Sequence, residues 1–240
     1  SQAVAKLIEG DKLWNQGKPD DAAQAYSDAA KLNPFDWRSH ERLAIVDASM
    51  SLFNEARKAL EQLKAVQPDP SAEVAQNRYD MFRKAFDKSF EMILKQYDDD
   101  SADFDKKIIS RESYYSTVNG LAHRLESMAK FLDALPVPSS KKPANLRRSL
   151  ACGLAAQAAS NSLDYLESNN KKAKANAGVF MSQAKKEIEA AAKLDANKVV
   201  VTKEAPQQGT GNREQGTENA DQGAESQPAA NEDAGPAEGW

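Results

Sequence analysis

The feature that most constrains this chain is a recurrence of side-chain size at an interval of 34 residues within its first 70 positions. The aligned pairs are Gly10 with Ala44, Ala22 with Ala56, Tyr26 with Leu60, Ala29 with Leu63, Leu32 with Val66 and Pro34 with Pro68. Two antiparallel helices approach closely only where small residues lie between them, and large residues fill the remaining space. Proline then ends a helix, because it lacks the backbone N–H. The recurrence therefore predicts two consecutive helical hairpins over residues 3–70.

This pattern resembles the tetratricopeptide repeat. The first copy follows the signature of that family closely, at Gly10, Leu13, Gly17, Ala22, Tyr26, Ala29, Leu32, Asn33 and Pro34. The second copy is weaker, because His40 stands where tryptophan is common and Leu60 replaces the aromatic residue. The resemblance covers less than a third of the 240 residues. It implies stacked helix pairs with a concave surface that binds other polypeptides.

The resemblance also implies which residues line that concave surface. Carried onto this sequence, the positions are Leu7, Asp11, Trp14, Arg38, Glu41, Ile45, Tyr79, Phe82 and Arg83. Trp14 is the expected anchor for a partner, and the alternative is that the third helix covers it. Relatives that grip the carboxyl terminus of chaperones use a clamp of lysines, asparagines and an arginine. The corresponding residues here are Leu7, Asp11, Arg42, Ala72 and Gln76, so that role is not expected.

Beyond the repeats, apolar residues recur at intervals of three and four, which predicts an all-α fold. An unbroken pattern over residues 71–97 predicts one long helix that caps the repeats and bridges to the rest. The acidic run at residues 98–103 is expected to be an interhelical loop. It is not expected to bind calcium, because it lacks the central glycine and closing glutamate of a helix-loop-helix calcium site. Residues 104–195 are expected to form a helical bundle of no recognised family.

Residues 201–240 differ in composition from the rest of the chain. From Thr202 onward there is no Val, Leu, Ile, Phe, Met or Tyr, so this acidic tail is expected to be disordered. It carries two basic and eight acidic side chains, a net charge of −6, whereas the whole chain carries −4. The first 200 residues are therefore close to neutral. Nucleic-acid binding is not expected, because it needs a basic face that displaces counterions.

Few residues could support catalysis. The two histidines, His40 and His123, belong to no metal-binding pair, and the single cysteine, Cys152, is expected to be a small buried hydrophobe. We therefore expect no enzyme activity, no cofactor and no metal site. No apolar run is long enough to span a membrane. A cytoplasmic location is expected, although cleavage of a leader also fits the sequence.

Two functional hypotheses remain. The first is an adaptor or scaffold that holds a peptide or helix of another protein in the concave surface. The second is a structural subunit of a larger assembly, which docks through the bundle and the tail or associates with copies of itself. Trp240, an isolated aromatic residue in a polar tail, is a weak candidate for a docking motif.

Overall fold

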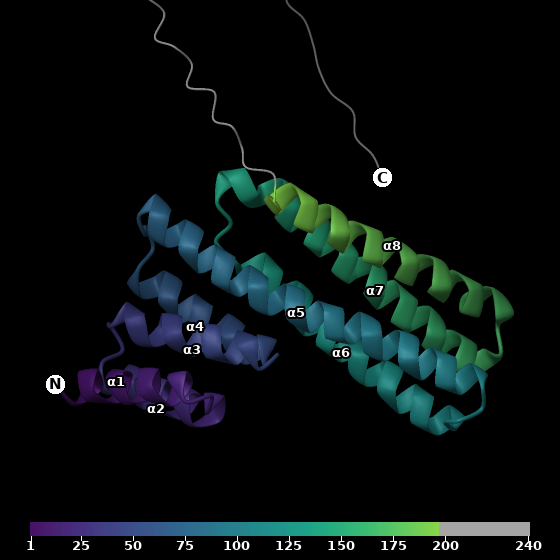
Figure 1. The fold of residues 1–240 in the computed structure, drawn as a ribbon, viewed down its shortest axis with the longest axis horizontal. Helices are drawn as coiled ribbons and strands as arrows, with labels where there is room; N and C mark the ends of the chain where they lie inside the picture. Colours follow the sequence, from purple (N-terminus) through teal and green to yellow (C-terminus); the bar gives the residue numbers. More distant parts are fainter. Residues whose placement is uncertain (197–240) are drawn as a thin grey trace, which may run out of the picture. The chain divides into compact units, whose positions relative to one another are not determined.

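The computed structural model of the chain describes residues 1–196 and contains no strand among them (Figure 1). The predicted disorder of residues 201–240 and the role of Trp240 lie outside the described residues. The eight α-helices of residues 1–196 are α1 (Gln2–Asn15), α2 (Pro19–Leu32), α3 (Trp37–Ser49), α4 (Phe53–Val66), α5 (Ala72–Asp105), α6 (Arg111–Ala134), α7 (Lys142–Ser168) and α8 (Lys171–Ala196). A short 3-10 helix, Ser139–Lys141, precedes α7. The expected all-α fold is confirmed.

The first four helices form the two predicted hairpins. Helix α1 packs against α2, α3 packs against α4, and α2 joins the hairpins by packing against α3. A Cβ atom added to Gly10 would lie 2.5 Å from Cε1 of the Tyr26 ring, so only glycine lets α1 approach α2 this closely. The aligned pair in the second hairpin, Ala44 and Leu60, is likewise buried. Whether these hairpins are tetratricopeptide repeats stays a prediction.

The predicted long helix is present, but the loop expected at residues 98–103 is wrong. Helix α5 continues through this run to Asp105 and ends only where Lys107 adopts a left-handed backbone, with φ of 59°. Asp98 pairs with Lys185, and the ring of Phe104 stacks on a tyrosine of α6 at 4.7 Å. These contacts with other helices stabilise the last turns of α5 despite its adjacent carboxylates.

Helix α5 runs alongside both the hairpins and the later helices (Figure 1). One apolar core includes buried residues from α3 through α8. At its centre Phe53 of α4 packs against Phe86 of α5 and Phe131 of α6, with ring centroids 6.3 and 5.1 Å apart. The hairpins and the bundle thus share a core, and the described residues 1–196 belong to one compact unit.

Cys152 belongs to this core and is fully buried, as expected. Its thiol donates a hydrogen bond to the carbonyl of Leu125, at 3.2 Å, and burial raises the pKa of the thiol to about 12. None of the helices in residues 1–196 has both the length and the apolar character needed to cross a bilayer.

Candidate functional site

Helices α1, α3 and α5 together line a hollow of about 280 Å³. One large apolar side chain comes from each helix: Trp14 from α1, Ile45 from α3 and Met81 from α5. Trp14 is 38% exposed and Met81 is 39% exposed, so both present apolar surface to solvent. The expected anchor Trp14 is therefore accessible and is not covered by the third helix.

A hydrogen-bonded ion pair forms the polar side of this hollow. The Asp11 carboxylate accepts a hydrogen bond from the Tyr26 hydroxyl, at 2.7 Å, and another from Nε of Arg42, at 3.0 Å. Burial, with a further contribution from the hydrogen bond to Asp11, raises the pKa of Tyr26. These contacts join α1, α2 and α3 and compensate the charge of Asp11. The hollow therefore combines an apolar wall with a neutralised ion pair.

The other expected residues of α1 and α3 are engaged within the chain. Leu7 belongs to the small core of the first hairpin. Arg38 is exposed, but its guanidinium binds Asp36, the residue that caps the start of α3, at 2.7 Å. Glu41 is buried and accepts a hydrogen bond from Arg78 of α5 at 2.7 Å. Leu7 and Glu41 thus stabilise the fold and offer no surface to a partner.

The expectation that Tyr79, Phe82 and Arg83 line the concave surface is not met. Tyr79 and Phe82 are each only 1% exposed, and the Phe82 ring packs edge-on against Phe131 at 5.7 Å. Helices α6, α7 and α8 lie against that face of α5, so these side chains contact the bundle. Met81 points to the open side instead. The sequence pattern does not single it out, because the free face of α5 is set by the position of the bundle.

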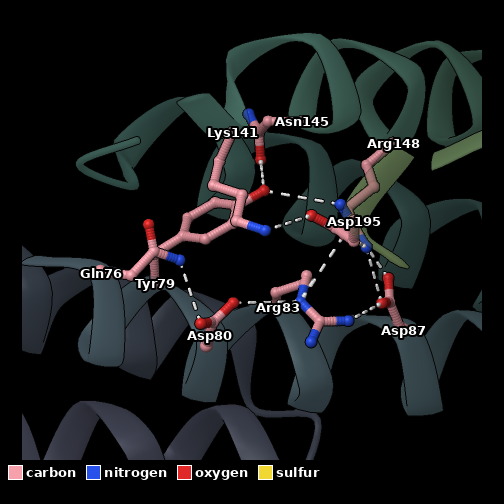
Figure 2. Close-up of polar contacts among 9 residues, drawn as sticks. All are labelled: Gln76, Tyr79, Asp80, Arg83, Asp87, Lys141, Asn145, Arg148 and Asp195. Carbon is pink, nitrogen blue, oxygen red and sulfur yellow. Dashed lines mark hydrogen bonds and ion pairs between the residues drawn. The ribbon is translucent and has the colours of Figure 1, made fainter. Parts of the chain in front are cut away.

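Figure 2 shows that Tyr79 and Arg83 belong to a polar network between α5, α7 and α8. Its centre is Arg148, which is fully buried and binds Asp87 through Nε and Nη2, at 2.7 and 2.8 Å. The Nη2 atom of Arg148 also binds Asp195 at 2.6 Å. Burial alone would lower the pKa of Arg148, but hydrogen bonds to Asp87 and Asp195 outweigh it and raise the pKa.

Two further cations complete the network. Lys141 lies 3.3 Å from Asp195, and Arg83 lies 3.2 Å from Asp87. Each buried charge therefore has a partner of opposite sign, the arrangement that a buried ion pair needs to be tolerated. The network fixes the end of α8 to α5 and α7. Nε of Arg83 and Oδ1 of Asp195 are buried without a hydrogen bond in the described residues, but they lie 3.7 and 3.3 Å from atoms of opposite charge.

In residues 1–196 no group of His, Cys, Asp and Glu side chains is arranged to hold a metal ion. His40 donates from Nε2 to the carbonyl of Pro34, at 2.8 Å, while His123 is exposed on α6. No family model, curated protein or solved structure matches the chain.

Proposed function

We propose that this chain is a non-enzymatic protein-interaction module, an adaptor or scaffold that binds an apolar segment of a partner in the hollow between α1, α3 and α5. The observation that carries the proposal is the convergence of Trp14, Ile45 and Met81 from three successive helices on one accessible hollow. The resemblance of residues 3–70 to the tetratricopeptide repeat supports the same function.

The chemistry of the hollow favours an apolar ligand group. Tryptophan and methionine are enriched at the centres of protein interfaces, where they gain from leaving water. The ion pair of Asp11 and Arg42 lies at the edge and can orient a polar backbone. A volume of about 280 Å³ suits one or two partner side chains. A helix or extended segment would present those side chains and extend beyond the hollow.

The test begins with affinity purification from native lysate, followed by a binding measurement with the purified partner. Trp14→Ala and Met81→Ser should each weaken the affinity at least tenfold, because each removes an accessible apolar contact. Val179→Ala is the matched control, since Val179 is 55% exposed on α8, outside the hollow. Affinity that falls only with the control variant, or with none of the three, would refute binding at this hollow.

A second candidate function is that of a structural subunit that docks through the bundle. Leu146 and Leu150 lie four residues apart on α7, and they are 70% and 46% exposed. Residues at this spacing share one helix face, so the pair forms an apolar patch. Sedimentation at high concentration tests self-association: Leu150→Lys should dissociate such an assembly, whereas a monomer at all concentrations would rule it out.

A further inference from the structure

A second groove lies between α2, α3 and α4. The face of α3 that lines this groove differs from the face that lines the hollow between α1, α3 and α5. Residues 40, 43 and 47 of α3, with Met50 directly after it, line this groove, whereas residues 42, 45 and 46 of α3 line the hollow. Its volume is about 760 Å³, and its apolar wall includes Leu43, Met50 and Leu52. We name it the outer groove.

Asp47 is the unusual residue of the outer groove. Only 6% of its surface is exposed, yet within residues 1–196 its carboxylate accepts no hydrogen bond and forms no ion pair. The interval of 34 residues aligns Asp47 with Leu13, which packs against the core of the first hairpin. A carboxylate thus occupies a position where the preceding hairpin has an apolar residue.

The surroundings of Asp47 disfavour a negative charge. Burial, followed by the nearby charge of Glu55, raises the pKa of Asp47 to about 6. Asp47 also lies in the last turn of α3, where the helix dipole opposes an anion. A largely buried carboxylate without a protein partner costs free energy, which a bound cation or a proton would recover.

The remaining charged groups of the outer groove leave an acidic excess. Besides Asp47 and Glu55, the acidic residues are Asp20 and Glu61, and the basic residues are Lys31 and Lys58. Lys31 lies 3.4 Å from Asp28 of its own helix, and Glu61 pairs with Arg57 of α4. Asp47, Glu55 and Asp20 then remain against Lys58. His40 also lines the groove, but its Nε2 atom is used by the carbonyl of Pro34. The groove is therefore complementary to a positively charged ligand.

We propose that the outer groove binds an arginine side chain of a partner polypeptide, with Asp47 receiving the guanidinium and Glu55 adding a second carboxylate. A guanidinium suits this site because it is weakly hydrated and offers several donors to carboxylates. Leu43, Met50 and Leu52 provide apolar surface for the arginine stem and its neighbours. The groove is larger than one side chain, so the partner contributes a segment.

This inference does not depend on the hollow between α1, α3 and α5. The two surfaces share none of their lining residues. Trp14→Ala should therefore leave arginine binding unchanged, and Asp47→Asn should leave apolar binding at the hollow unchanged. The failure of one proposal can thus be told apart from the failure of the other.

The experiment is an NMR titration of the full, ¹⁵N-labelled chain at about pH 7.5, where Asp47 is ionised. The probe is N-acetyl-arginine methylamide, and its matched control is the citrulline analogue, which has nearly the same shape and no charge. The arginine probe should shift the amide resonances of Asp47, Leu52 and Glu55 and should saturate below about 0.1 M. The citrulline analogue should bind at least fivefold more weakly.

Substitutions in the chain test which of its residues bind the arginine probe. Asp47→Asn should weaken the arginine probe at least fivefold, and Glu55→Gln should weaken it less, because Glu55 is exposed. Glu73→Gln, at the start of α5, is the control and should change nothing. Equal responses to the arginine and citrulline probes in the unmodified chain, or no saturating shift at Asp47, would overturn the proposal without reliance on any variant.

Discussion

The α5–α7–α8 junction and the outer groove each bury a charged side chain, and the surroundings of the two charges differ. Arg148 at the junction is 0% exposed and has hydrogen bonds to Asp87 and Asp195. Asp47 in the outer groove is 6% exposed, and no side chain among the described residues pairs with its carboxylate. A compensated buried charge holds elements together, whereas an uncompensated one lowers stability. The contrast separates a structural site from the proposed binding site.

The largest expected change in stability comes from a substitution at the α5–α7–α8 junction. Arg148→Ala leaves the carboxylates of Asp87 and Asp195 without their main cation, so the free energy of unfolding should fall by about 3–5 kcal/mol. Arg147→Ala is the matched control, because Arg147 directly precedes Arg148 in α7 and forms an exposed pair with Glu187 at 2.7 Å. Its removal should cost about 0.5 kcal/mol. Similar losses in urea unfolding of the two variants would contradict a structural role for the network.

Replacing the buried charged residue of the outer groove should instead raise the free energy of unfolding. Asp47→Leu installs the residue type of the first hairpin and removes the unpartnered carboxylate, so stability at neutral pH should rise by on the order of 2 kcal/mol. Asp20→Asn, on the exposed rim, should change it by less than about 0.5 kcal/mol. Destabilisation by Asp47→Leu at every pH would show that the carboxylate has a structural partner.

The pH dependence of this gain follows from the raised pKa of Asp47. The folded chain holds the Asp47 proton more tightly than the unfolded chain, whose carboxyl has the ordinary pKa of 3.8, against about 6 in the fold. The penalty of the charge is therefore fully present above about pH 6 and disappears as the pH falls toward 4. The advantage of Asp47→Leu over the natural chain, measured by urea unfolding, should shrink over that interval.

A further comparison is between a glycine of the first hairpin and a glycine of α6. Gly10→Ala places a methyl group against the Tyr26 ring, which burial and the hydrogen bond to Asp11 hold in place, so stability should fall by about 1–3 kcal/mol. Gly120→Ala in α6 meets open space and should gain about 0.5–1 kcal/mol from helix propensity. Thermal unfolding measures both. A neutral Gly10→Ala would mean that the first hairpin is looser than described.

The sequence predicts those features that depend on local side-chain size. Gly10, Tyr26 and the prolines specify the hairpins because each acts within its own helix pair. The extension of α5 through Asp98 depends on lysines of α8 far along the chain, which no local pattern reveals. The prediction of a loop there is wrong for that reason.

The residues of the candidate sites also divide into those that local sequence predicts and those that depend on distant contacts. Trp14 was identifiable from its repeat position, whereas the exposure of Met81 and the burial of Tyr79 depend on where the bundle packs on α5. Asp47 did leave a signal, since the interval of 34 residues aligns it with Leu13. Only the fold shows that the carboxylate is buried without a partner.

The most direct test of this contrast is a ¹³C NMR titration of the Asp47 carboxyl in the unmodified chain, with no ligand present. An uncompensated buried carboxylate should titrate with a midpoint near pH 6, well above the ordinary aspartate value of 3.8. A midpoint near pH 4 would mean that Asp47 is solvated or paired in the folded chain. The outer groove would then hold no uncompensated charge, and the proposed arginine site would be refuted.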